Sequence, residues 1–481
     1  MFSPDLKRVL CNGDLDPDAF VRRDLILDAL DAAAPPPDTR AIVFVAGDLQ
    51  ILGERAGLVA WGRRSLEDAM NKGYGCVAAA RPGQTNLARQ TLAAVGLPEI
   101  PVVEANPETI AQYCLRLEPG PSPDPALRIS SPTPLKQDTE ILLRRAFSGF
   151  KSIKLTALTG GRSMTDGIWR VEADSTDAEL RSPFVVKCGS RDSIDMQVRT
   201  YRDVVADRVP FRGCAPLCLE RSVAGYRKRL SVSRFVERAD RLDALLINPN
   251  CANPEKIVDH IFEGPLHRWR TKPQTLNLRL LDQFLPPRVR RKYRSGLNAL
   301  HKKLPVGTAS SPADLFSVMK AIPPRDVPVC RAHDDLNFRN VFVAEGGVEI
   351  ILIDFTRAVV KPLAQDIARM DVGLAFDDEL NEAQPIADDV LEAYYSRDLF
   401  SISLPHSVKG RGARARLTAI EALRNRMLME ASAQDYDPTV EYKIAIVAGL
   451  LYEARRKTKW SATAYRCADA LVSTLKKSGA L

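Results

Sequence analysis

The sequence lacks the long apolar runs and leader segments that mark membrane and secreted proteins. None of its hydrophobic runs reaches the roughly 18 residues that a membrane-crossing helix needs. The first ten residues, MFSPDLKRVL, contain no hydrophobic stretch of the signal-peptide kind. We therefore expect a cytoplasmic protein without a membrane partner.

Cysteine and histidine are also scarce, and both are scattered along the chain. The nine cysteines are an odd number, only Cys214 and Cys218 lie close together, and no second pair follows at zinc-finger spacing. The five histidines are equally dispersed. These patterns indicate reduced thiols, and they argue against a disulfide framework and against a cysteine–histidine metal cluster.

The charge balance favours small anionic ligands over nucleic acid. The 68 lysines and arginines exceed the 60 acidic residues by eight, which is a mild bias for 481 residues. The basic clusters at residues 288–292, 411–416 and 455–457 are not interleaved with aromatic residues, as a single-strand binding surface would be. We therefore expect no nucleic-acid partner, whereas a nucleotide suits this charge.

One segment has the composition of a linker. Residues 118–139 read EPGPSPDPALRISSPTPLKQDT, which is rich in Pro and Ser and has no apolar periodicity. A chain of this length is also about three times a typical domain of ~150 residues. We therefore predict a first domain at residues 1–118, a linker at 119–139 and further domains after it.

Strand and helix patterns alternate within residues 1–118. Continuous apolar runs, typical of buried parallel strands, occur at residues 41–46, 76–80 and 100–103. Helical patterns occur at residues 20–30, 55–70, 86–95 and 108–117. This order predicts a small α/β domain. No motif within it indicates a role.

The remainder of the chain changes character once. Strand patterns occur at residues 153–158, 167–172, 184–187 and 230–236, with one helical stretch at 193–206. After residue 239 the pattern is mostly helical, apart from a hairpin formed by residues 341–343 and 350–353. We therefore predict an α+β arrangement with a small β-rich lobe at 140–238 and a large helical lobe at 239–481.

The strongest chemical signal is the segment HDDLNFRN at residues 333–340, which the hairpin and IDF at 353–355 follow. Phosphoryl transfer from ATP needs metal ions that bridge the phosphates and a group that orients the acceptor hydroxyl. The hairpin between Asn340 and Asp354 can place an amide oxygen and a carboxylate at one Mg²⁺ site, and Mg²⁺ prefers such oxygen ligands. Asp335 lies on the same loop and can reach an acceptor.

This segment resembles the catalytic loop and metal-binding Asp of the protein-kinase-like fold, in its aminoglycoside phosphotransferase and choline kinase branch. The resemblance covers residues 151–475 and implies ATP and Mg²⁺ as cofactors. It implies that Asp335 is the catalytic base, that His333 braces the loop, and that Asn340 and Asp354 are metal ligands. Asp334 stands where the family usually has Gly, which is a departure in backbone freedom rather than in a catalytic group.

The β-rich lobe contains the matching nucleotide elements in the expected order. Gly160, Gly161 and Ser163 lie between two strand patterns and could approach phosphates closely. Lys187 ends an apolar strand and resembles the lysine that contacts the α- and β-phosphates. Gln197 occupies the position of the glutamate that normally pairs with this lysine, so it supplies a hydrogen bond but no charge. Asp195, about 200° away around the helix, should face elsewhere.

The chain after Asp354 indicates the class of acceptor. Only eleven residues separate Asp354 from Asp366, where a protein kinase has a long activation segment. Asp366 resembles the aspartate that buttresses the catalytic loop in the small-molecule branch. An insert at residues 240–304 occupies the place where this branch often builds its acceptor pocket. Its His267 and Trp269 could stack on a substrate, although packing explains both more simply.

The sequence thus predicts an ATP- and Mg²⁺-dependent phosphotransferase whose partners are a nucleotide and a hydroxyl-bearing substrate, with a small molecule as the expected acceptor. Two alternatives stay open. Gln197 favours a nucleotide-binding pseudokinase. The attached domain favours a regulatory or scaffold module of a multi-protein stress or defence system, in which residues 1–118 bind a protein partner.

Overall fold

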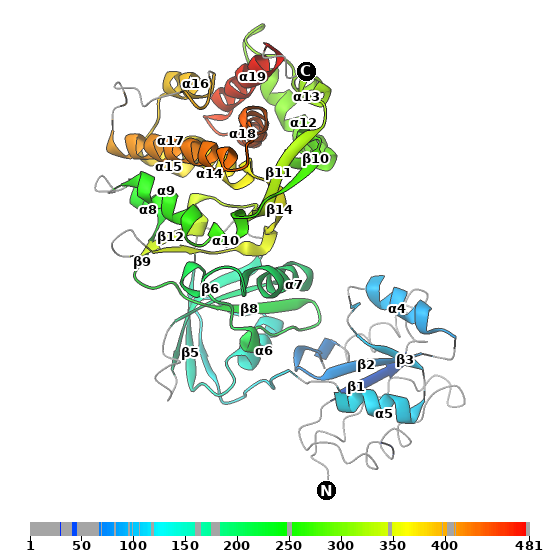
Figure 1. The fold of residues 1–481 in the computed structure, drawn as a ribbon. Helices are drawn as coiled ribbons and strands as arrows, with labels where there is room; N and C mark the ends of the chain where they lie inside the picture. Colours follow the sequence, from blue (N-terminus) through cyan, green and yellow to red (C-terminus); the bar gives the residue numbers. More distant parts are fainter. Residues whose placement is uncertain are drawn as a thin grey trace. The chain divides into compact units, whose positions relative to one another are not determined.

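The computed structural model divides into two compact units (Figure 1). The first unit comprises Met1–Val198 and Leu217–Phe235, and the second comprises Arg199–Pro216 and Val236–Leu481. The structure describes Ala29, Val408 and residues 41–45, 67–68, 70–80, 83–94, 97–98, 100–104, 106–116, 120–158, 165–174, 183–247, 253–344, 349–396, 398–401 and 410–477.

The first unit begins with the predicted α/β sheet. Strands β1 (Ala41–Val45), β2 (Gly75–Ala80) and β3 (Val102–Glu104) pair in parallel in the order β1-β2-β3. Helices α4 (Thr85–Ala94) and α5 (Pro107–Arg116) follow β2 and β3. The α/β prediction is therefore confirmed for this part. The helices predicted at 20–30 and 55–70 lie almost entirely outside the described residues.

A five-stranded sheet forms the β-rich lobe. Its strand order is β4-β5-β6-β7-β8, in which only the β4–β5 pair is parallel. The strands and the two helices that accompany them are β4 (Arg128–Ser130), α6 (Gln137–Ala146), β5 (Ser152–Ala157), β6 (Thr165–Asp174), β7 (Phe184–Ser190), α7 (Arg191–Thr200) and β8 (Lys228–Arg234). Phe147, Phe150 and Phe184 form its aromatic core, with ring centroids 5.6 to 6.4 Å apart.

The segment predicted as a linker is partly built into this lobe. β4 pairs with β5, and α6 begins at Gln137, so both lie partly or wholly within residues 119–139. Leu127 is buried, and its carbonyl, like those of Asp124 and Pro125, accepts a hydrogen bond from the Arg144 guanidinium. Most residues of the segment are exposed or half-buried, but it is not without structure, since Arg144 bonds its backbone at residues 124–127 and β4 and α6 include part of it.

Arg145 connects the α/β sheet region to the β-rich lobe. This buried side chain donates to the carbonyls of Met70 (3.2 Å), Asn71 (3.0 Å), Pro121 (2.9 Å) and Ala224 (2.7 Å). The loop before β8 also contributes, because Tyr226 packs against the α/β core and its N–H donates to Asn71 Oδ1 at 2.9 Å. The two parts of the first unit are thus joined by buried hydrogen bonds as well as by the chain.

The second unit is the predicted large helical lobe (Figure 1). Its helices of eight or more residues are α9 (Pro254–Glu263), α12 (Pro287–His301), α13 (Pro312–Ala321), α14 (Ala364–Phe376), α16 (Asp388–Ser396), α17 (Arg411–Ser432), α18 (Thr439–Ala454) and α19 (Ser461–Lys477). Shorter helices are α8 (Leu242–Ile247), α10 (His267–Arg270), α11 (Leu280–Phe284) and α15 (Asp378–Ala383). α18 is apolar nearly all round and is buried among its neighbours, as expected of a central helix.

This lobe contains more strands than the sequence indicated. The predicted hairpin is present as β12 (Val341–Ala344) and β13 (Ile350–Leu352), and β9 (Ala239–Arg241) pairs with β12. A second sheet, in the order β10-β11-β14, consists of β10 (Gln274–Leu278), β11 (Arg325–Ala332) and β14 (Val359–Pro362). The insert at 240–304 is mostly helical, as its pattern indicated, but it also contains β10 and the end of β9.

Two predicted absences can be compared with the described part of the chain. None of the helices there combines the length and apolar character needed to cross a bilayer. The six cysteines whose state is described, Cys76, Cys188, Cys214, Cys218, Cys330 and Cys467, are all free. Burial raises the pKa of the Cys214 thiol to about 11, so it remains protonated at neutral pH.

Candidate active site

The loop after β11 is held by a buried carboxylate at the start of α14. Asp366 Oδ2 accepts the backbone N–H of His333 at 2.8 Å, and its Oδ1 accepts that of Asp334 at 3.0 Å. Asp366 is completely buried. The buttressing role that the resemblance implied for Asp366 is therefore confirmed, since two N–H groups of the loop depend on this one carboxylate.

The ring of His333 packs beneath the loop and the hairpin. Its Nε2 lies 2.9 Å from the carbonyl oxygen of Ile353, and only a protonated Nε2 can donate to that oxygen. Its ring lies 4.8 Å from that of Phe355, which in turn packs against Trp269 at 5.6 Å. These contacts agree with a bracing role for His333. Trp269 is buried in the core, so packing accounts for it, while His267 is exposed.

Asp334 adopts the backbone conformation that explains why glycine is usual at its position. Its φ is +58°, in the left-handed region, which glycine enters freely and aspartate tolerates better than most residues. Its carboxylate lies 3.4 Å from the Arg357 guanidinium. Burial raises the pKa of Asp334, and Arg357 opposes this rise. The departure from glycine therefore adds an ion pair to the loop, in a backbone conformation that glycine also adopts.

The side chain of Asp335 is partly exposed, at 29%. One of its carboxylate oxygens, Oδ1, lies 3.3 Å from the guanidinium of Arg369 on α14. Its backbone carbonyl accepts hydrogen bonds from the amides of Asn337 and Asn340, each at 2.9 Å. The loop backbone is thereby fixed by two side chains, while the carboxylate remains accessible to an acceptor.

The hairpin returns the chain from Asn340 to the residue before Asp354. The N–H of Ile353 donates to the Asn340 carbonyl at 3.0 Å, which places Asp354 one residue from this contact. Asn340 Nδ2 donates a hydrogen bond to the Asp335 carbonyl, so the side-chain oxygen of Asn340 is the atom available as a ligand. Asp354 Oδ1 accepts from the Thr356 hydroxyl at 2.7 Å, which orients the carboxylate.

These donors fit Mg²⁺. Both are hard oxygen ligands, and Mg²⁺ is typically bound by one or two protein oxygens together with substrate phosphates and water. Within the described residues there is no group of three or more His, Cys, Asp or Glu side chains suited to a metal ion. A two-ligand site completed by phosphate oxygens is compatible with that finding, whereas an all-protein metal cage is not found in this part of the chain.

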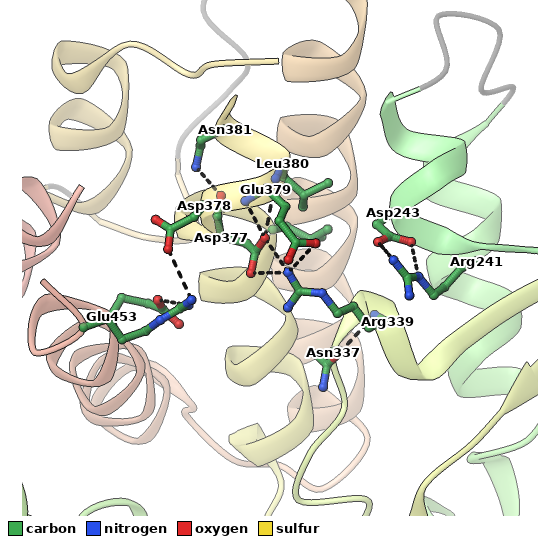
Figure 2. A network of polar contacts seen from close by, with 12 residues as sticks. Arg241, Asp243, Asn337, Arg339, Asp377, Asp378, Glu379, Leu380, Asn381 and Glu453 are labelled. Atoms are coloured by element: carbon green, nitrogen blue, oxygen red, sulfur yellow. Dashed lines mark hydrogen bonds and ion pairs between the residues drawn. The ribbon is translucent and has the colours of Figure 1, made fainter. Parts of the chain in front are cut away.

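Arg339, in the same loop, anchors it to the helical lobe (Figure 2). Its guanidinium is bonded to both carboxylate oxygens of Asp377, at 2.8 and 2.9 Å, and lies 3.1 Å from Glu379. Asp377 in turn caps α15 by accepting the N–H of Glu379. The sequence alone did not predict a role for Arg339, Thr356 or Arg369. For Arg339, its place inside the HDDLNFRN segment could have indicated one.

Lys187 and Gln197 lie close to one residue of β8 in the first unit. Ser231 is the strand partner of Lys187, and cross-strand partners project from the same face of a sheet. The Ser231 hydroxyl donates to Gln197 Oε1 at 3.5 Å. Asp195 pairs instead with Arg191, at 3.6 Å, and with Arg229. Gln197, rather than Asp195, is therefore the α7 side chain that reaches the strand partner of Lys187.

The structure thus groups the candidate residues in two sets. His333, Asp335, Asn340 and Asp354 come together in the second unit. Lys187 and Gln197 come near each other in the first. Gly160, Gly161 and Ser163 lie outside the described residues.

Comparisons with known proteins show what the chain is similar to. A sequence model of the phosphotransferase enzyme family (APH) matches residues 158–400. Among solved structures, an ethanolamine kinase from Plasmodium vivax is 14% identical, with a TM-score of 0.33 and coverage of 66% of this chain and 82% of that one. A macrolide 2'-phosphotransferase type I is 13% identical, with a TM-score of 0.37 and coverage of 69% and 97%. An aminoglycoside-3'-phosphotransferase of type VIII is 16% identical, with a TM-score of 0.31 and coverage of 57% and 93%. No curated protein sequence matches the chain.

Proposed function

Because the chain belongs to the phosphotransferase enzyme family, we propose that it transfers the γ-phosphoryl group of ATP to a hydroxyl group of a small molecule, with Mg²⁺ as cofactor. The observation that carries this proposal is the loop-and-hairpin geometry. It places Asp335, Asn340 and Asp354 on one braced segment, held from below by Asp366.

Each residue has a role that its contacts support. Asp335 orients the acceptor hydroxyl and accepts its proton, since its carboxylate is accessible and its backbone is fixed. Asn340 and Asp354 hold Mg²⁺, which neutralises phosphate charge when bound. Lys187 contacts the nucleotide phosphates, as do Gly160, Gly161 and Ser163. His333 acts on the loop through the Ile353 carbonyl and does not touch the acceptor.

The short connection after Asp354 supports a small acceptor. The eleven residues before Asp366 are taken up mostly by the turn Phe355–Arg357, strand β14 and the first two residues of α14. β14 is paired with β11 along its length. No length remains there for a platform that could bind a peptide substrate.

A nucleotide-binding pseudokinase is the second candidate, and Gln197 favours it. A glutamine can hydrogen-bond a lysine, but it carries no negative charge. A carboxylate would position the lysine more strongly. In this reading residues 1–118 form a separate domain with a protein partner, and the protein acts as a regulatory or scaffold module. The domain division at residues 118 and 139 remains a prediction in both readings.

One experiment separates the two candidates. The purified protein is incubated with ATP, Mg²⁺ and a panel of hydroxyl compounds, and phosphorylated products are identified by mass spectrometry. We expect at least one phosphorylated acceptor and its loss in the Asp335→Asn variant. Binding of ATP without any transfer to an acceptor or to water would favour the pseudokinase.

A further inference from the structure

Arg369 places a positive charge beside the proposed catalytic base. Its guanidinium lies 3.3 Å from Asp335 Oδ1 and is about as accessible as the carboxylate, with 26% and 29% of the two side chains exposed. Arg369 lies on α14, three residues after the buttressing Asp366. Any acceptor whose hydroxyl reaches Asp335 therefore also comes within reach of Arg369.

A second arginine and two tyrosines extend this cationic surface. The guanidinium of Arg369 lies over the ring of Tyr452, 4.7 Å from its centre. The guanidinium of Arg455 lies over the same ring at 4.6 Å and over Tyr293 at 4.5 Å. Tyr452 also interacts with Arg369 through a side-chain hydrogen bond, as Tyr293 does with Arg455, but a guanidinium has five N–H donors, so both arginines keep others for a ligand.

Arg455 is the less neutralised of the two arginines. Among the described residues, no carboxylate lies within ion-pair distance of Arg455, and its Nε is buried without a hydrogen-bond partner there. Its neighbour Arg456 differs, since Glu453 and Asp378 pair with it at 2.7 and 3.2 Å. Arg369 is paired with Asp335, so the positive charge of this cluster that no described ion pair balances is that of Arg455.

We propose that the acceptor carries an oxyanion, a carboxylate or a phosphate, as well as the hydroxyl group that is phosphorylated. This proposal rests on the proposed function. Arg369 and Arg455 bind the oxyanion, because a guanidinium matches the geometry of two oxygens of such a group. The hydroxyl group of the acceptor then lies at Asp335. The ion pair between Arg369 and Asp335 is partly replaced by an ion pair between Arg369 and the oxyanion of the acceptor.

An acceptor that is an amine fits this surface less well. An ammonium group near Asp335 would lie against the Arg369 guanidinium, and like charges in contact oppose binding. The aromatic rings offer little relief, because each is already covered by an arginine. The same four residues that attract an oxyanion therefore select against a cationic acceptor.

Matched acceptors test the charge preference directly. Phosphoryl transfer is measured on a hexose set of glucose, glucuronate, glucose 6-phosphate and glucosamine, and on a three-carbon set of glycerol, glycerate and glycerol 3-phosphate. Within a set, we expect kcat/KM of at least one anionic member to exceed that of the neutral and cationic members by about tenfold or more. One charged hydrogen-bonded contact contributes enough binding free energy for a difference of that size. The carboxylate and phosphate arms show which oxyanion is preferred.

The variants test the residues. Arg369→Gln and Arg455→Gln should each raise KM for the preferred anionic acceptor by about tenfold and leave KM for ATP unchanged, and Arg455→Gln should also leave KM for the neutral member unchanged. Arg369→Lys should retain part of the preference. Arg466→Gln is the matched control, because Arg466 is a similarly exposed arginine on α19 that is paired with Glu392.

Three outcomes would overturn the inference. Neutral or cationic acceptors could match the anionic ones, or the arginine variants could raise KM for all acceptors alike. In either case the proposed function would stand and the acceptor class would be wrong. Hydrolysis of ATP without turnover of any anionic acceptor would also contradict the acceptor class and leave the proposed function standing. If ATP were neither bound nor hydrolysed, the proposed function itself would fail, and this inference with it.

Discussion

The carboxylate of Asp366 accepts the backbone N–H of His333 across 33 positions of sequence. The adjacent N–H of Asp334 bonds to the other oxygen of the same carboxylate. Because Asp366 lies in the first turn of α14, the loop that contains Asp335 is tied directly to the core of the helical lobe. The position of the proposed base thus depends on one buried side chain.

Replacing Asp366 should therefore affect both stability and activity. Asp366→Ala leaves two buried N–H groups without an acceptor, so we expect a loss of about 2–5 kcal/mol in the free energy of unfolding. Asp366→Asn keeps one acceptor oxygen and should be less destabilising. Urea unfolding measures stability, and phosphoryl transfer measures activity. A stable, fully active Asp366→Ala variant would show that the loop does not depend on this contact.

Glu441 should make stability depend on pH. It is fully buried and accepts the Ala364 N–H at 2.7 Å, at the first residue of α14. Burial raises its pKa to about 7, and the Ala364 N–H, Tyr436 and Arg270 oppose the rise only partly. The folded state therefore binds a proton that the unfolded state releases between about pH 4.5 and 7.

By linkage, the stability that this proton provides is present below about pH 4.5 and is lost as pH rises through 7. The loss amounts to roughly 3 kcal/mol. Glu441→Gln removes this titration. The free energy of unfolding of the variant minus that of the native protein should therefore increase between pH 5 and pH 8. Thermal unfolding across that range tests this, with Glu382→Gln, at an exposed position in the same lobe, as the control. A stability difference that does not vary with pH would contradict the raised pKa.

The sequence was most informative where structure depends on neighbouring residues. The hairpin follows from patterns within about 20 residues, and the structure contains it, with a backbone hydrogen bond between Ile353 and Asn340 at its base. The positive φ of Asp334 was also signalled locally, by the family's preference for glycine at this position.

Contacts between distant residues could not be predicted in this way. Arg339 pairs with Asp377 and Arg369 with Asp335, across 38 and 34 positions, and only the tertiary fold brings these charges together. Strand β11 was missed because Pro328 lies inside it, and a proline argues against the central strand of a sheet. The hydrogen bonds from Arg144 to the carbonyls of the Pro-rich segment after residue 118 could not be predicted either, because composition gives no sign of them.

Arg145 should govern how firmly the α/β sheet region is held in the first unit. Arg145→Ala would leave buried carbonyls of Met70, Asn71 and Ala224 without this donor, so we expect a loss of roughly 3 kcal/mol or more in stability. Hydrogen exchange should quicken in residues 70–73 and 224–226. The exposed Arg89→Ala variant is the control. Unchanged exchange in those segments would mean that Arg145 does not join them.

Gln197→Glu should preserve or raise phosphotransferase activity. The substitution introduces a carboxylate next to Ser231, the strand partner of Lys187, where it can pair with the lysine. An added ion pair should hold Lys187 more firmly for the nucleotide phosphates, so KM for ATP should not increase. Gln197→Ala, which removes the polar group, is the comparison. A folded Gln197→Glu variant with lower activity than Gln197→Ala would contradict the proposed placement.

The central claim is that Asp354 acts on the nucleotide through Mg²⁺ whereas Asp335 acts on the acceptor. Calorimetric titration of ATP with and without Mg²⁺, on the Asp354→Asn and Asp335→Asn variants beside a turnover assay, tests it most directly. Asp354→Asn should weaken Mg²⁺-dependent ATP binding as well as turnover. Asp335→Asn should leave ATP binding nearly unchanged while turnover falls by roughly 10²-fold or more, as expected for a lost general base. Equal loss of ATP binding in both variants, or full activity of Asp335→Asn, would contradict the account.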